Sequence, residues 1–392
     1  MNSWDEVVMK EIREYVTSIV SNLVKIKSEN PPGNEVEAAE YAVEEMKKLG
    51  LDAWVDEFAE KRANAIGSFR RGEGPTLLFI THLDVVPAGD EELWSIPPFS
   101  GTIKDGRIYG RGSADAKGCF GAMLGALKML AEENWLINGE RILAAVADEE
   151  VGERGVKRFL EQGVKADYAV VGEPTSLEVC TAHKGRAELS IKFLGKPAHA
   201  SQPFRGINAI YAASDFALKI EKLAQRLRKK RGAMGYPTIA LTIMEGGVKS
   251  NIIPESCTVI LDRRLLPWEH SEKAIDEIKR LAEKSAKARK AKIEFKINQH
   301  VAASETDRKS RIVTAGLKAV SKVLEKKARP KLFQATCDMS PLVHEGKIPT
   351  IILGPGDLRQ AHVVDEWVLI DELEKGSRIY REIAAEILGA RE

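Results

Sequence analysis

Short runs of apolar residues recur along this chain of 392 residues, on either side of its middle part. Stretches with helical periodicity separate them, for example residues 36–49, 118–132 and 156–162. A short, nearly all-apolar run is typical of a strand that is buried on both faces. Such strands, alternating with helices, predict an α/β fold with a mostly parallel sheet. The clearest runs are 76–81 (TLLFIT), 141–147 (RILAAVA), 168–171 (YAVV) and 350–353 (TIIL).

The middle of the chain differs in both pattern and charge. Residues 183–297 contain 24 Lys or Arg against 12 Asp or Glu, whereas the whole chain has a net charge of only +1. Four predicted strands and two predicted helices alternate there, an arrangement typical of a small α+β domain. We therefore predict a main domain made of residues 1–182 and 298–392, with a second domain, residues 183–297, inserted into it.

Side chains that can bind metal ions follow the predicted strands. In a parallel sheet, ligands bind beyond the carboxyl ends of the strands, so these side chains are expected to meet. That many carboxylates would repel one another without a cation between them. Two imidazoles and three carboxylates suit a pair of zinc ions that share one carboxylate, although solvated loop residues remain an alternative. The residues are His82 and Asp84, Asp115, Glu149 and Glu150, Glu173, and His362.

The same residues stand in a series of motifs: 82–84 (HLD), 110–118 (GRGSADAKG), 148–152 (DEEVG), 172–175 (GEPT), 195–208 (GKPAHASQPFRGIN) and 361–366 (AHVVDE). In this order they resemble the M20 metallopeptidases. That family includes acetylornithine deacetylase, succinyl-diaminopimelate desuccinylase, aminoacylase-1 and glutamate carboxypeptidases. The resemblance covers nearly the whole chain. It implies a zinc-peptidase-like catalytic domain with an inserted lid and dimerisation domain.

The resemblance also implies two divalent metal ions per subunit, with zinc expected first and cobalt or manganese as alternatives. His82, Asp115 and Glu173 would bind one ion, and Asp115, Glu150 and His362 the other, so that Asp115 bridges them. The peptide bond after Asp115 would be cis.

Further residues receive roles from the resemblance alone. Asp84 would orient His82 through its second ring nitrogen, and Glu149 would be the general base. In the inserted domain, His199 would donate a hydrogen bond to the oxyanion from the partner subunit of a homodimer. Arg264 would bind the substrate carboxylate with Asn251 beside it. The alternative for Arg264 is an ion pair with Asp262.

Three functions follow as hypotheses. Deacylases of the family commonly have Glu at the position of Glu173, which favours removal of an acetyl or succinyl group from an N-acyl amino acid in amino-acid biosynthesis. The alternative enzyme is an M20-type dipeptidase or carboxypeptidase. The third hypothesis is a non-catalytic protein that binds nucleic acid through the basic insert. Balanced charge and the lack of a long apolar segment argue against nucleic-acid and membrane partners, and favour a cytoplasmic enzyme.

Overall fold

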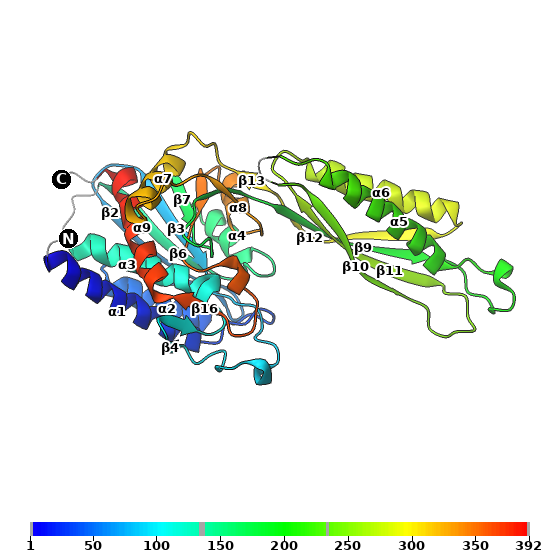
Figure 1. Cartoon of the computed structure of the whole chain (residues 1–392), viewed down its shortest axis with the longest axis horizontal. Coiled ribbons are helices and arrows are strands. Elements are labelled where there is room, and N and C mark those ends of the chain that lie inside the picture. The colour runs from blue at the N-terminus through cyan, green and yellow to red at the C-terminus, as the bar shows by residue number, and fades with distance from the viewer. Residues whose placement is uncertain (1–2, 133–137, 233–234, 390–392) are drawn as a thin grey trace. The chain divides into compact units, whose positions relative to one another are not determined.

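A computed structural model describes residues 3–132, 138–232 and 235–389 of the chain (Figure 1). The chain divides into two compact units. Unit 1 comprises Met1–Ala182, Glu305–Phe333 and Cys337–Glu392, and unit 2 comprises His183–Ser304 and Gln334–Thr336. The inserted domain was predicted to end at Ile297, whereas the first segment of unit 2 ends at Ser304. Its last strand continues to Val301.

Unit 1 is built on a nine-stranded sheet in the order β1-β2-β6-β3-β7-β15-β8-β13, with β14 paired to β8. The four apolar runs form its centre, where β6, β3, β7 and β15 pair in parallel. This confirms the predicted α/β fold. Antiparallel pairs, β1 with β2, β2 with β6 and β8 with β15, make the complete sheet mixed. The strands are β1 (Asp52–Ala59), β2 (Arg62–Arg71), β3 (Thr76–His82), β6 (Gly139–Val146), β7 (Tyr168–Val171), β8 (Cys180–His183), β13 (Ser304–Glu305), β14 (Lys331–Phe333) and β15 (Thr350–Ile352).

Helices bury one face of this sheet in a single hydrophobic cluster. Leu77 and Phe79, alternate residues of β3, share that cluster with apolar residues of α2, α3, α7 and α9. The Tyr380 ring of α9 meets Phe79 edge-on at 5.6 Å, and its hydroxyl donates to the Leu353 carbonyl oxygen at 2.6 Å. α1 packs against α3 and α9, while α4 and α8 pack together (Figure 1). The helices are α1 (Ser3–Lys25), α2 (Val36–Lys48), α3 (Gly118–Glu132), α4 (Arg154–Glu161), α7 (Arg311–Val323), α8 (Met339–His344) and α9 (Ile370–Leu388).

A small second sheet also belongs to unit 1, in the order β16-β5-β4. Its strands are β4 (Thr102–Lys104), β5 (Arg107–Tyr109) and β16 (Trp367–Leu369). β5 precedes the turn that contains Asp115, and β16 follows the segment that contains His362. The antiparallel pairing of β5 with β16 therefore brings these two segments together. Among the described helices of the chain, none is long and apolar enough to cross a membrane.

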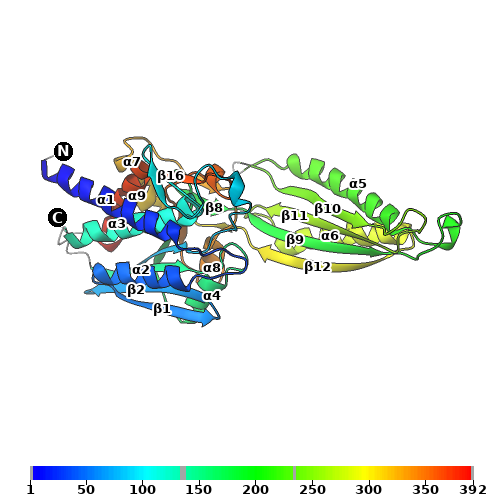
Figure 2. The same cartoon turned by 90° about the horizontal axis from the view of Figure 1, so that it is seen from below.

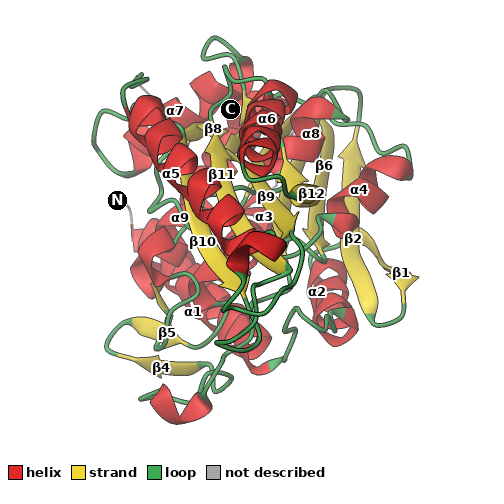
Figure 3. Ribbon diagram, turned by 90° about the vertical axis from the view of Figure 1, so that its right-hand side faces the viewer, coloured by secondary structure: helices red, strands yellow, loops and turns green. Residues whose placement is uncertain are grey.

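Unit 2 is an antiparallel sheet in the order β10-β11-β9-β12, with two helices over one face (Figures 2 and 3). Side chains of β9 and β11 are alternately buried and partly exposed, as expected of a sheet with one covered face. The buried set forms a second hydrophobic core with α5 and α6. The elements are β9 (Gly185–Leu194), α5 (Ala209–Arg228), β10 (Thr238–Gly246), β11 (Ser256–Leu265), α6 (Ser271–Ala288) and β12 (Lys292–Val301).

Candidate metal centre

The predicted metal ligands meet at the carboxyl edge of the parallel strands in unit 1. The two ring nitrogens that face this edge, Nε2 of His82 and Nε2 of His362, lie on either side of the Asp115 carboxylate. One Asp115 oxygen is 3.2 Å from His82 and the other is 3.4 Å from His362. Glu150 Oε1 lies 3.2 Å from His362 Nε2, and Glu173 Oε1 lies 3.9 Å from His82 Nε2. Asp115 thus occupies the position that a bridging ligand requires.

The electrostatics of this cluster fit a site for cations. Although burial alone would lower the pKa of His82, its hydrogen bond to Asp115 and the charges of Glu149 and Glu173 raise that pKa well above its usual value. Burial, reinforced by neighbouring carboxylates, raises the pKa values of Glu149 and Glu173 far above the usual range. Buried carboxylates grouped in this way are stabilised as anions when divalent ions lie between them. The donor set, with imidazole and carboxylate ligands, suits zinc.

Asp84 supports the cluster, but not in the way that was expected. The carbonyl oxygen of Asp84 lies 2.9 Å from His82 Nδ1, whereas its carboxylate is 3.7 Å away. The fully buried carboxylate instead accepts hydrogen bonds from the backbone N–H groups of Glu149 and Glu150, each at 3.1 Å. The backbone of Asp84 therefore orients the histidine, and its side chain holds the loop after β6.

A buried glutamate holds the turn that carries Asp115. Glu366 Oε1 accepts from the backbone N–H groups of Ala114 and Asp115 at 3.0 and 3.1 Å. Its Oε2 accepts from the N–H of Gly112 at 3.0 Å and from Arg111 Nη1 at 2.7 Å. The Asp115–Ala116 peptide bond is cis, as the resemblance implies. Glu366 stands in the sequence motif around His362, but no local pattern connects it with Asp115.

Other side chains near the metal centre were not singled out from the sequence. Asn30 contacts Asp84 and Asp148, and Arg62 contacts Asp148. Asp338 is 1% exposed, and neither of its carboxyl oxygens has a hydrogen-bond partner among the described residues. Burial raises its pKa well above the usual range. These residues lie far apart in the sequence, so no local pattern connects them.

The predicted residues of unit 2 separate into two groups. His199 is exposed, and its Nδ1 lies 2.7 Å from Ser201 Oγ. Asn251 lies beside it, because the Asn251 carbonyl oxygen accepts from the N–H of Ala200. Residues next to His199 and Asn251 in the sequence line a cavity of about 490 Å³.

Arg264 lies at the opposite end of β11, separated from Asn251 by roughly 25 Å of extended strand. Within one chain the two residues therefore lie far apart, and their shared role in substrate binding stays a prediction. Arg264 forms a two-point ion pair with Asp262, with Nε to Oδ1 at 2.8 Å and Nη2 to Oδ2 at 3.3 Å. That pair is the alternative foreseen from the sequence.

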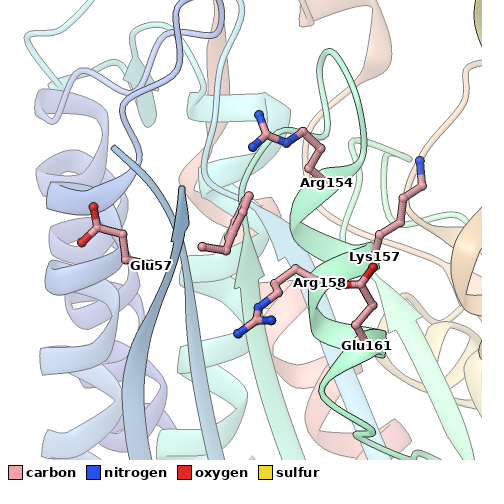
Figure 4. A pocket seen from close by; sticks show the side chains of 6 residues that line it. Glu57, Arg154, Lys157, Arg158 and Glu161 are labelled. Carbon is pink, nitrogen blue, oxygen red and sulfur yellow. The ribbon is translucent and has the colours of Figure 1, made fainter. Parts of the chain in front are cut away.

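A separate cavity of about 500 Å³ in unit 1 lies between β1 and α4 (Figure 4). Arg158 from α4 pairs with Asp56 at 3.2 Å, and Arg154 extends over the Phe58 ring at 5.5 Å. None of the predicted metal ligands belongs to its lining. The lining residues are Glu57, Phe58, Arg154, Lys157, Arg158 and Glu161.

The chain is similar to known proteins in both sequence and fold. The sequence profile of a family described as "Peptidase family M20/M25/M40" matches residues 78–386. A probable succinyl-diaminopimelate desuccinylase of Staphylococcus aureus (strain MRSA252) is 27% identical over 400 residues, covering 94% of this chain and 97% of the relative. An acetylornithine deacetylase of Proteus mirabilis (strain HI4320) is 30% identical over 333 residues, covering 82% of each. The solved Bacillus subtilis YXEP protein, a dinuclear metal-binding peptidase of the M20 family, shares the fold at 17% identity and a TM-score of 0.73, covering 97% of this chain and all of that one.

Proposed function

Because the chain belongs to peptidase family M20/M25/M40, and is a hydrolase of that family, we propose that it removes an acyl group from an N-acyl amino acid. The observation that carries this proposal is the Asp115 carboxylate, which has one oxygen toward His82 and the other toward His362. Similarity to a desuccinylase and a deacetylase supports an acyl substrate. Glu173 supports it further, since deacylases of the family commonly have Glu at that position.

We assign His82, Asp115 and Glu173 to one divalent ion, and Asp115, Glu150 and His362 to the other. Zinc is the proposed metal, since its preferred ligands are those present. Two such ions, when bound, supply positive charge that lowers the pKa of a water molecule and polarises the amide carbonyl.

Glu149 is the proposed general base. It accepts a proton from the attacking water as the water oxygen bonds to the carbonyl carbon. It then gives that proton to the amine nitrogen as the carbon–nitrogen bond breaks, so a carboxylate and an amine leave. The two hydrogen bonds from the backbone of Glu149 and Glu150 to Asp84 keep base and ligand in fixed positions.

The test is a release assay with zinc or cobalt added. N-acetylornithine, N-succinyl-diaminopimelate and a panel of dipeptides and tripeptides are compared at equal concentration, with Glu149→Ala as the blank. We expect kcat/KM for one N-acyl amino acid to exceed that for every peptide by at least about tenfold. Preferential cleavage of peptides would establish the peptidase alternative instead.

We further propose that the enzyme acts as a homodimer formed through unit 2. Among the described strands, β10 ends the sheet order with β11 as its neighbour. β10 exposes Ile243 and Met244, and α5 exposes Tyr211 and Leu218, which are 62% and 61% accessible. An edge strand beside apolar side chains favours pairing with a second copy.

In unit 2, His199 and Asn251 lie far from Arg264. This distance supports a role for His199 in the active site of the partner subunit. A small substrate cannot contact both ends of β11, so His199 and Arg264 of one chain cannot both bind it. If both contact the substrate, they come from different copies. Mixing inactive Glu149→Ala and His199→Ala proteins under subunit exchange tests this arrangement, because one site of each mixed dimer has both residues intact. Activity should reappear, whereas a mixture that stays inactive despite proven exchange would exclude the role.

A further inference from the structure

A buried arginine lies next to the loop after β6, and the proposed chemistry assigns it no role. Arg62, the first residue of β2, is 5% exposed. Its Nη2 donates to Asp148 Oδ1 at 2.5 Å, and its Nη1 donates to Asn30 Oδ1 at 3.2 Å. Its Nε lies 3.1 Å from Glu35 Oε2. The guanidinium group is therefore enclosed by polar partners on three sides.

The contacts continue from Arg62 to the metal centre without a break. Asn30 Nδ2 donates to Asp148 Oδ1 at 3.0 Å and to Asp84 Oδ2 at 2.8 Å. Asp84 in turn accepts from the backbone N–H groups of Glu149 and Glu150. Four buried side chains thus connect β2 with the residues proposed as base and metal ligand.

Asp148 is the point where this chain of contacts reaches the backbone of the loop. It has φ of +68°, in the left-handed region that few residues other than glycine adopt. Its carbonyl oxygen accepts from the N–H groups of Gly152 and Glu153, which closes the turn. Because the side chain is held by Arg62 and Asn30, the backbone keeps a conformation that directs the next two N–H groups to Asp84.

The positive charge of Arg62 also stabilises the buried Asp148 carboxylate beside it. Asp148 is 3% exposed, and a buried carboxylate needs a paired cation. Arg154 approaches Asp148 only at 4.0 Å and is 54% exposed in its side chain, so it cannot replace the buried arginine. The planar guanidinium group presents a separate nitrogen to each of Asp148, Asn30 and Glu35, whereas an ammonium group has only one nitrogen.

We propose that Arg62 is a positioning residue for the metal centre. Acting through Asp148, it fixes the loop that presents Glu149 and Glu150. The inference rests on the proposed function for the roles of those two glutamates. Residues that support metal ligands from outside typically change metal affinity or activity by about 10–100-fold when they are replaced.

The test compares Arg62→Met and Arg62→Lys with the wild-type protein. The Co²⁺ dissociation constant is measured by competition with a chelator, and the absorption bands of bound Co²⁺ report ligand geometry. kcat and KM are then measured at saturating metal. For Arg62→Met we expect a Co²⁺ dissociation constant at least about tenfold weaker, altered bands, and a kcat at least about tenfold lower with KM within about threefold. Arg62→Lys, which retains the charge but not the fork, should fall between.

Two controls separate positioning from general destabilisation. Val320→Ala in α7 weakens folding at a core residue whose apolar side chain makes no hydrogen bond or ion pair with the proposed ligands, and it should leave Co²⁺ binding and kcat unchanged. Arg158→Met removes another arginine–aspartate pair of unit 1 and should do the same. The proposal is overturned if Arg62→Met folds and its Co²⁺ dissociation constant, kcat and KM all stay within about threefold of the wild-type values.

If Arg62→Met does not fold, Asp148→Asn is measured in its place. This change keeps the shape of the side chain at position 148 and removes the charge that Arg62 contacts. It should show the same losses to a smaller degree, and wild-type behaviour would likewise overturn the proposal. If the wild-type protein hydrolyses none of the amides tested, the proposed function fails. The Co²⁺ dissociation constants still decide the role of Arg62.

Discussion

Replacing Glu366 by Gln should weaken both the fold and the metal centre. The change keeps the size of the side chain but removes its charge and replaces one oxygen by an NH₂ group. In either orientation this group faces two donors, the pair Arg111 and Gly112 or the pair Ala114 and Asp115. Two hydrogen bonds are therefore lost in a side chain that is 0% exposed.

The magnitude follows from the burial of the partners. Arg111 is 3% exposed and loses its countercharge, and breaking a buried ion pair from one side costs about 3–5 kcal/mol. Each backbone N–H left without a partner costs about 1–3 kcal/mol. Since Arg111 also donates to the Val363 carbonyl oxygen and stacks over Trp94, part of this cost is relieved. We expect the free energy of unfolding to fall by about 4 kcal/mol.

Urea unfolding of the metal-free protein measures this change, and Co²⁺ competition measures the second effect. Because the N–H of Asp115 loses its acceptor, the Co²⁺ dissociation constant should weaken by about tenfold or more. Glu374→Gln is the matched control, since its pair with Arg13 is 2.9 Å long but 40% exposed on the arginine side and should cost less than about 1 kcal/mol. A Glu366→Gln protein within about 1 kcal/mol of wild type would refute the reasoning.

Three further outcomes are expected. Glu149→Ala should lower kcat by at least about 100-fold while metal analysis finds both ions retained, and loss of metal would show that Glu149 is a ligand. His82→Ala should lose metal and activity together, and full activity after exhaustive chelation of the wild type would contradict the metal-dependent mechanism. Burial raises the pKa of Glu153 to about 7 despite Lys157, so the folded protein keeps a proton that the unfolded chain has lost. Stability should therefore fall as pH rises from about 4.5 to about 7, and Glu153→Gln should remove up to about 3 kcal/mol of that fall in urea titrations; an unchanged slope would count against a buried, protonated Glu153.

Local sequence pattern predicted the centre of unit 1 well. A strand with both faces buried is apolar at nearly every position, so residues 76–81, 141–147, 168–171 and 350–353 could be recognised without any knowledge of their neighbours. Parallel pairing then requires that their carboxyl ends lie at one edge. His82, Glu150 and Glu173 could be predicted to meet there because each stands within three residues of the end of such a run.

The edge strands gave no comparable signal. β1 has one buried side chain among eight and alternates irregularly, so its antiparallel pairing with β2 depends on contacts that its own residues do not reveal. The mixed character of the sheet was for this reason decided by tertiary structure.

The supporting side chains were decided by tertiary structure as well. Asn30, Arg62 and Asp148 carry no common spacing, and they meet only because the loop before α2, the start of β2 and the end of β6 pack together. The same holds for Glu366 and the turn of Asp115, which the pairing of β5 with β16 brings into contact.

In unit 2, Asn251 and Arg264 stand only 13 positions apart in the sequence. Asn251 precedes the start of β11 and Arg264 stands near its end, and an extended strand turns a short sequence separation into a long distance. Residue type and periodicity are local properties, so the sequence determined which chemistry is present, whereas the distances between side chains depend on how distant segments pair and pack.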